Sequence, residues 1–429
     1  MTINFFNRNS KISKMGDFVE VKHIDGLQVA SVSADLYQNV RDDVALFYFP
    51  DGANHAVAYT QNSVVSESIT WNRENTKDNI KALIVNTKNA NTFTGDQGIK
   101  GLDEIAKNLV ETLKKMEIEN GYKQTKIKDL LFASTGVIGE KFPTEKINNN
   151  ISNLVANLRI NQNKLIWMKI ASAILTTDTR PKVAFTEIKI GDKIIRISAI
   201  AKGSGMIAPN LATMLSFIFT DADISSVNLS KYLNKALTNT FNAITVDSDT
   251  STNDMVVVFA TKKIKNKNLN NTSSKEFLKF EKALSTVCLD LAKQIVIDGE
   301  GAKKFITVKV ISSKTVEKAK KIAFAIANSP LVKTAVAGED PNWGRILMGL
   351  GKSGEKIDQK KLIIKIGDFI VAEKGKISPS YNEEKLQEYM TSNSIYIEID
   401  LKQGKEEFEC YTCDFTHDYI DINAHYRRS

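Results

Sequence analysis

The spacing of apolar side chains switches between two periods along the chain, which predicts a mixture of strands and helices. Short apolar runs that suit buried strands occur at residues 44–49, 81–86, 130–134, 214–219, 255–260 and 305–310. Runs in which apolar residues recur every three or four positions, as in amphipathic helices, occur at 102–116, 275–296 and 316–327. The stretches 147–158 and 165–175 are also predicted to be helical.

Several strands are expected to pair with their neighbours in the sequence. Residues 183–190 and 193–200 alternate well around Gly191-Asp192, which predicts a hairpin. Residues 361–372 are similar to a hairpin, and 394–401 and 407–414 are expected to form a further strand pair. Strands and helices follow no strict βαβ order, and the chain contains no internal repeat or long linker. We therefore predict an α+β fold with mixed sheets, in two closely packed parts.

The composition excludes several classes of protein. Apolar residues make up 42% of the 429 positions and charged residues 25%, which is typical of a globular protein and not of a disordered chain, coiled coil or collagen. The longest apolar runs are strand-sized, far short of the roughly 18 residues that cross a membrane. Residues 1–6 do not begin a secretory signal, and three cysteines do not form a disulfide framework. We expect a soluble cytoplasmic protein.

The net charge of +8 comes from an excess of lysine, because only nine of the 58 basic residues are arginine. Surfaces that bind phosphate groups favour the bidentate fork of arginine. The lysine-rich stretch 262–282 contains Phe277 and Phe280, but its apolar spacing suits a solvated amphipathic helix. We therefore expect no nucleic-acid partner.

The segment 201–220 is the most informative part of the chain. A glycine-rich run leads to Pro209-Asn210, and Thr213 then stands where a loop enters an apolar strand. If the bond between Ala212 and Thr213 were cut, the new α-amine, with a pKa of about 7.7–8.0, could act as base for the hydroxyl of its own residue. A glycine-rich turn before a core strand is the alternative, and spacing alone favours it.

This segment resembles the self-processing site of the ornithine acetyltransferase family, also called bifunctional glutamate N-acetyltransferase, of cyclic arginine biosynthesis. The same family has a series of short motifs, and stretches similar to them occur in the expected order along nearly the whole chain. These stretches are 85–91, 134–139, 176–179, 202–207, 212–214, 247–254, 298–302, 340–345, 411–414 and 422–424. Each is short, but the whole series is specific. The resemblance therefore favours processing at Thr213 over a simple turn.

The resemblance implies a mixed-sheet α/β sandwich of the ornithine acetyltransferase and DmpA-like type, with the active site between two parts. N-acetylornithine would acetylate Thr213 and leave as ornithine, and glutamate would then accept the acetyl group as N-acetylglutamate. Self-cleavage would give an α chain of residues 1–212 and a β chain of residues 213–429, assembled as a heterotetramer of two α and two β chains. No metal or other cofactor is implied.

Acetyl-CoA as a second donor stays open at this stage, because the family contains enzymes of both types. Our hypothesis is that N-acetylornithine works well and that acetyl-CoA works weakly or not at all.

The resemblance also assigns roles to single residues. Thr213 is the expected nucleophile, with cleavage between Ala212 and Thr213. Thr135 and Gly136 follow an apolar strand, where a hydroxyl and a backbone N–H would form the oxyanion hole; a strand-ending turn is the alternative. The residues expected to bind substrate are Thr176, Lys202, Thr213, Glu300, Asn423 and Ser429.

The residue types alone would give these positions ordinary roles. Thr176 would be a helix end, and Lys202 and Glu300 would be solvated loop residues. Ser429 stands six positions after Asn423, whereas the family has a Ser or Thr five positions after its Asn, so one residue is inserted here.

Cys410 and Cys413, followed by His417 and His425, have the composition of a zinc site. Both cysteines lie in a predicted strand without a turn residue, so their sulfur atoms are not expected to converge, and we predict no metal site.

Two other functions stay open. An amidase or aminopeptidase with an N-terminal nucleophile would use the same Thr213 but transfer the acyl group to water. An uncut basic interaction protein would show no processing.

Overall fold

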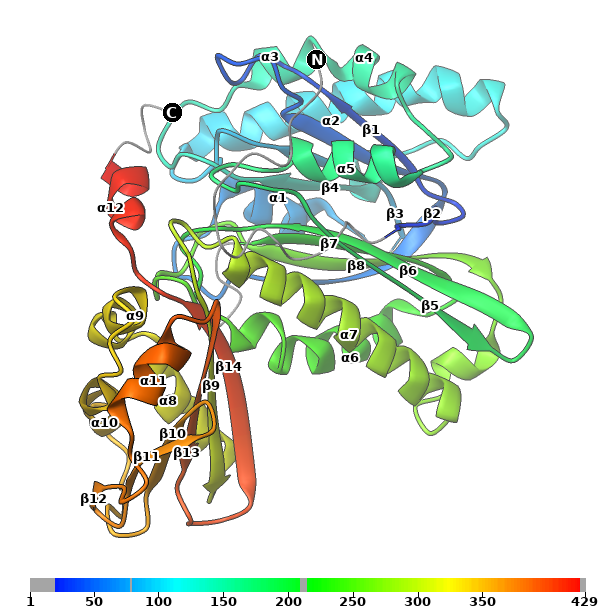
Figure 1. Ribbon diagram of the computed structural model, residues 1–429. Coiled ribbons are helices and arrows are strands. Elements are labelled where there is room, and N and C mark those ends of the chain that lie inside the picture. The colour runs from blue at the N-terminus through cyan, green and yellow to red at the C-terminus, as the bar shows by residue number, and fades with distance from the viewer. Residues whose placement is uncertain (1–19, 78, 209–213, 425–429) are drawn as a thin grey trace.

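The computed structural model describes residues 20–77, 79–208 and 214–424 of the chain. Two sheets, both with parallel and antiparallel strand pairs, are packed with helices (Figure 1). This arrangement confirms the predicted α+β fold with mixed sheets. None of the helices in these three ranges is long and apolar enough to cross a membrane.

The larger sheet has eight strands in the order β4-β3-β2-β8-β7-β6-β5, with β1 paired to β2. The pairs β3–β4 and β7–β8 are parallel, and the other neighbours are antiparallel. Its strands are β1 (Gln28–Val32), β2 (Val44–Tyr59), β3 (Asn79–Asn86), β4 (Leu130–Ser134), β5 (Lys182–Ile190), β6 (Lys193–Lys202), β7 (Leu215–Ala222) and β8 (Met255–Ile264).

Helices cover this sheet on both sides (Figure 1). Helix α7 packs on β5 and β6, and helix α6 packs on β2. The two helices contact each other, and the rings of Tyr232 and Phe277 stack between them at 4.1 Å. Helices α1–α4 pack on β2–β4, and α5 lies over β1, β5 and β6. The bounds are α1 (Glu67–Asn75), α2 (Gly95–Glu119), α3 (Thr144–Asn148), α4 (Ile151–Ala156), α5 (Lys164–Ala173), α6 (Ser226–Thr238) and α7 (Lys275–Ile297).

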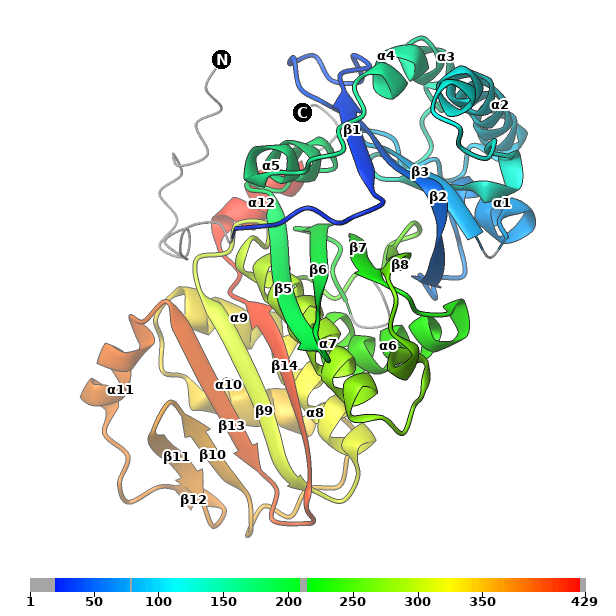
Figure 2. The ribbon, with the colours of Figure 1, turned by 90° about the vertical axis from the view of Figure 1, so that its right-hand side faces the viewer.

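The smaller sheet has six strands in the order β12-β11-β10-β13-β9-β14, and its edge strand β14 contacts α7 (Figure 2). The strands are β9 (Phe305–Ser313), β10 (Ile363–Ile366), β11 (Phe369–Glu373), β12 (Lys376–Ile377), β13 (Ser394–Asp400) and β14 (Glu406–Cys413). Its apolar core is shared with helices α8 (Val316–Ala327), α9 (Pro330–Ala337), α10 (Trp343–Gly351) and α11 (Glu383–Met390). The last described helix is α12 (His417–Ala424), which follows β14.

Most predicted elements are confirmed, and one predicted pairing is wrong. Strands β5 and β6 form the expected hairpin, with Ile190 opposite Lys193, and β10 and β11 form the second one. Strands β13 and β14 do not pair with each other, because β9 lies between them, parallel to β13 and antiparallel to β14. Two strands that are neighbours in the sequence are therefore separated in the sheet by β9, which ends at Ser313, long before β13 begins at Ser394.

The connection between the antiparallel strands β6 and β7 begins and ends at the same end of these two strands, since Lys202 pairs with Leu215. Strands β7 and β8 pair with each other and lie between β6 and β2, with β7 hydrogen-bonded to β6 and β8 hydrogen-bonded to β2. A cut between residues 212 and 213 would therefore leave two pieces that share one continuous sheet.

Candidate active site

A tight turn follows strand β4 at Thr135 and Gly136. The N–H of Thr135 donates to the carbonyl oxygen of Asn86 (3.1 Å), and the residue is buried. Gly136 has φ of +137°, and a Cβ there would lie 2.1 Å from the carbonyl carbon of Lys88. Only glycine fits this position without moving the backbone, so the turn is built for close approach of two chain segments.

Buried polar side chains hold this turn in place. The hydroxyl of Ser134 donates to Oδ1 of Asn86 (2.7 Å) and lies 2.7 Å from the hydroxyl of Ser68. The amide Nδ2 of Asn253 donates to the carbonyl oxygen of Ser134 (2.5 Å). The asparagine-rich stretch 85–91 thus acts as internal support for the turn, which a purely local interpretation of the sequence does not reveal.

Lys202 is the last residue of strand β6 and is only 3% exposed. Its Nζ donates to the Thr135 hydroxyl oxygen at 3.1 Å. The interpretation of Lys202 as a solvated loop residue is therefore wrong. Strand β6 extends to Lys202, and the turn at Thr135 and Gly136 covers its side chain. Burial lowers the pKa of Lys202, and the negative charge of Asp178 opposes that effect.

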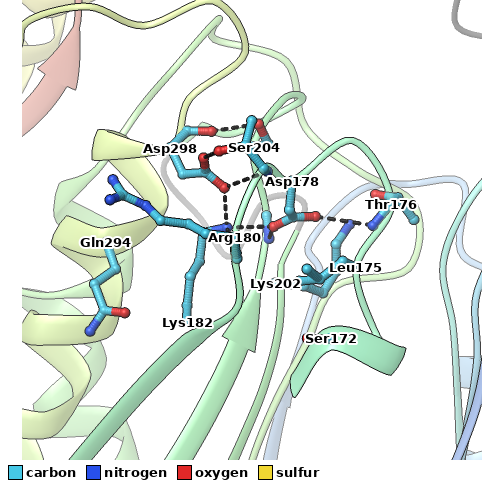
Figure 3. A network of polar contacts seen from close by, with 12 residues as sticks. Ser172, Leu175, Thr176, Asp178, Arg180, Lys182, Lys202, Ser204, Gln294 and Asp298 are labelled. Atoms are coloured by element: carbon cyan, nitrogen blue, oxygen red, sulfur yellow. Dashed lines mark hydrogen bonds and ion pairs between the residues drawn. The ribbon is translucent and has the colours of Figure 1, made fainter. Parts of the chain in front are cut away.

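Thr176 lies shortly after the end of α5 and is half-buried. Its backbone N–H donates to Oδ2 of Asp178 (3.1 Å). Asp178 belongs to a fully buried group of charges with Lys182 and Asp298 (Figure 3). Thr176 is thus fixed through its backbone.

Glu300 follows helix α7 and is 6% exposed, so its interpretation as a solvated loop residue is also wrong. The Asn423 amide of α12 donates to Glu300 Oε2 at 2.7 Å. A Cβ on Gly205 would lie 2.3 Å from the same oxygen. The glycine-rich loop and α12 therefore close around this carboxylate from two sides.

Asp247 anchors the end of the same glycine-rich loop. Its carboxylate accepts the N–H groups of Met206 (2.6 Å) and Ile207 (2.9 Å), although φ of Met206 is +58°. The hydroxyl of Tyr419 in α12 lies 3.3 Å from Oδ2 of Asp247. This carboxylate holds the loop in an unfavourable backbone conformation just before residues 209–213.

Ala212, Thr213 and Ser429 lie outside the described residues, so their predicted roles stay predictions. The nearest described residues, Ala208 and Met214, are both buried. The N–H of Met255 donates to the carbonyl oxygen of Met214 (3.1 Å), which fixes the start of β7.

The described residues that the sequence marked as a site do come together. Thr135 contacts Lys202, and Glu300 contacts Asn423. The loop after Lys202 joins the two pairs through Gly205. The supporting carboxylates of Asp178, Asp247 and Asp298 were not predicted from the sequence. All three lie inside the stretches that resemble family motifs, so a charged residue within such a stretch could have indicated them.

The two cysteines of strand β14 face different cores. Cys410 is buried in the core of the smaller sheet, and Cys413 is buried in the core that helices α6 and α7 share with the larger sheet, close to Gly299. His425 lies outside the described residues. In the part of the chain that the structure describes, no group of three or more histidine, cysteine or acidic residues could hold a metal ion.

Comparisons with known proteins place the chain in a family. The ArgJ family matches residues 28–428. The chain is 40% identical over 408 residues to the arginine biosynthesis bifunctional protein ArgJ of Brucella melitensis biotype 1, with 94% of this chain and 95% of that protein covered. It is 40% identical over 409 residues to the protein of the same name from Zymomonas mobilis, with 95% and 96% covered. A crystal structure of the argJ protein from Bacillus halodurans is 41% identical with a TM-score of 0.48, and the match covers 50% of this chain and 100% of that one. The chain belongs to the ArgJ family.

Proposed function

We propose that this chain transfers an acetyl group from N-acetylornithine to glutamate through an ester on Thr213, with ornithine and N-acetylglutamate as products. As a member of the ArgJ family, the chain is an acetyltransferase of arginine biosynthesis. The observation that carries the detailed proposal is the contact of Lys202 with Thr135, directly beside the loop that leads to Thr213.

This contact suits stabilisation of an oxyanion. Because Lys202 donates to the hydroxyl oxygen of Thr135, the hydroxyl hydrogen is free to donate elsewhere. Together with the N–H of Gly136, it can stabilise the negative charge that develops when Thr213 attacks the acetyl carbonyl. In acyl-transfer enzymes each such donor contributes about 3–4 kcal/mol to transition-state stabilisation.

The charged groups suit an amino-acid substrate. N-acetylornithine and glutamate both carry an α-carboxylate, which the buried ammonium of Lys202 can bind. The buried Glu300 carboxylate, which already accepts a hydrogen bond from Asn423, can hold a substrate ammonium group. Thr176 and Ser429 complete the proposed binding set. Because a bound amino acid occupies these groups, the acyl ester is presented to an amine in place of water.

The sheet order supports a stable association of the two pieces after cleavage, because both contribute strands to the larger sheet. We propose that cleavage gives chains of residues 1–212 and 213–429, that the strands β7 and β8 keep them together, and that two such pairs form the heterotetramer.

A comparison of donors tests the reaction. We expect N-acetylornithine to be the faster donor, and we expect acetyl-CoA to support weaker or no turnover. Of these two outcomes for acetyl-CoA, the name of the relatives at 40% identity, which contains the word bifunctional, favours weak turnover over none. Initial rates of N-acetylglutamate formation with each donor measure the difference. Turnover of acetyl-CoA as fast as that of N-acetylornithine would overturn this ranking.

The same assay separates transfer from hydrolysis. Acetate release in place of N-acetylglutamate formation would identify an amidase. A single full-length chain without acetyl transfer would favour the alternative of an uncut interaction protein.

Replacing Glu300 by Ala should spare self-cleavage and impair transfer. Loss of a buried charge-assisted contact costs about 1.5–3 kcal/mol, which corresponds to a fall of roughly 10- to 150-fold in kcat/KM. Steady-state kinetics on the cleaved protein measure this fall. Glu187→Ala, which removes a partly exposed carboxylate paired with Lys22 on the surface, is the control and should leave kcat/KM unchanged. If Glu300→Ala blocked maturation while the cleaved fraction kept normal kinetics, this role for Glu300 would be wrong.

A further inference from the structure

Three segments that lie far apart in the sequence each carry one residue of the proposed binding set. Thr176 lies in the segment 175–180, Lys202 begins the segment 202–205, and Glu300 lies in the segment 298–301. A buried group of charges, formed by Asp178, Lys182 and Asp298 and here named the buried triad, connects all three segments (Figure 3).

Asp178 joins the first two segments. One of its oxygens accepts the N–H of Gly203 at 2.7 Å and lies 2.6 Å from Nζ of Lys182. Its other oxygen accepts the N–H of Thr176 at 3.1 Å. Burial raises the pKa of Asp178, but attraction to Lys182 and Lys202 outweighs burial and keeps the pKa well below its ordinary value. Asp178 is therefore charged at neutral pH and holds the residues next to Lys202 on one side and Thr176 on the other.

Asp298 joins the third segment to the others. Its carboxylate lies 2.7 Å from Nζ of Lys182 and accepts the N–H of Thr179 at 2.9 Å. Its backbone oxygen accepts the hydroxyl of Ser204 at 2.6 Å, and the N–H of Glu300 donates to the backbone oxygen of Ser204 at 3.0 Å. The position of Glu300 relative to Lys202 is thus set through Asp298 and Ser204.

The side chains of Asp178 and Lys182 are 0% exposed and that of Asp298 is 3% exposed. Buried ion pairs often contribute less stability than well-packed apolar residues of similar volume, because removing charges from water is costly. The side chains of the buried triad also contact the loop backbone, at Thr176, Thr179, Arg180 and Gly203. A role in fixing loop geometry explains this better than a role in global stability.

We propose that Asp178, acting through the buried triad, is a positioning residue that sets the spacing of Thr176, Lys202 and Glu300 for an amino-acid substrate. This inference rests on the proposed function. It assigns to Asp178, Lys182 and Asp298 an effect on substrate binding without any contact between them and the substrate.

The test compares Asp178→Asn with a matched variant remote from the site. Glu117→Gln removes the charge of an equally buried carboxylate, paired with Lys81 at 2.8 Å between α2 and β3. We expect Asp178→Asn to raise KM for both N-acetylornithine and glutamate by roughly 10- to 150-fold, with a much smaller change in kcat. Glu117→Gln should lower thermal stability and leave both KM values unchanged.

A milder variant keeps the test informative if Asp178→Asn does not fold. Ser204→Ala removes one neutral hydrogen bond to Asp298 and leaves the charges intact, so both KM values should rise by roughly 2- to 12-fold. Unchanged KM values in the folded, cleaved forms of these variants would overturn the proposal. Wild-type protein without acetyl transfer would instead overturn the proposed function, so the two failures are distinguishable.

Discussion

Replacing Thr213 by Ala is expected to give an inactive protein that stays a single chain of 47.7 kDa. Without a hydroxyl at this position, nothing attacks the carbonyl of Ala212, so no new N-terminus forms. The same change removes the group that carries the acetyl ester, so both cleavage and transfer are lost completely. Intact-mass measurement and the transfer assay check the two losses separately.

Thr213→Ser is the matched control, because it keeps a hydroxyl of the same reach. It should still be cleaved, whereas transfer should be weakened by the loss of the methyl group that restricts the side-chain rotamer. Activity in Thr213→Ala, cleaved or uncleaved, would exclude Thr213 as the nucleophile.

Replacing Thr135 by Val is expected to lower kcat by roughly 100- to 1000-fold while leaving the protein folded and cleaved. Valine has nearly the same shape but removes the hydroxyl that Lys202 contacts at 3.1 Å and that is proposed to stabilise the oxyanion. Steady-state kinetics with N-acetylornithine and glutamate measure the effect.

Two variants make this result specific. Thr135→Ser restores the hydroxyl and should recover most of kcat. Thr240→Val removes an equally buried hydroxyl, bonded to the carbonyl oxygen of Ala236 at 2.7 Å after helix α6, and should change stability without changing kcat. A Thr135→Val enzyme with wild-type kcat would show that the hydroxyl takes no part in the reaction.

Elements with strong local periodicity could be predicted from the sequence. Helices α7 and α8 and the hairpin of β5 and β6 match their predicted ranges closely, because their burial follows one face of a regular element. The order of strands could not be predicted in the same way. Strand β9 separates β13 from β14, and β7 and β8 lie between β6 and β2, and both arrangements depend on contacts between distant segments.

The site shows the same division. Thr135, Glu300 and Asn423 were found through family motifs, and the structure brings them to one region. The burial of Lys202 was not predicted, because a lysine beside glycines has the local composition of an exposed loop. The pairing of Lys182 with Asp298 was also missed, since two charges 116 positions apart leave no local pattern.

The most direct test of the central claim is the mass and N-terminal sequence of the purified wild-type protein, before and after incubation with N-acetylornithine alone. We predict two chains of nearly equal size that co-purify, the second beginning Thr-Met-Leu-Ser-Phe at residue 213. After incubation, the second chain alone should carry one acetyl group on Thr213, and added glutamate should remove it as N-acetylglutamate. A single full-length chain with full transfer activity, or transfer without any acetylated chain, would contradict the account.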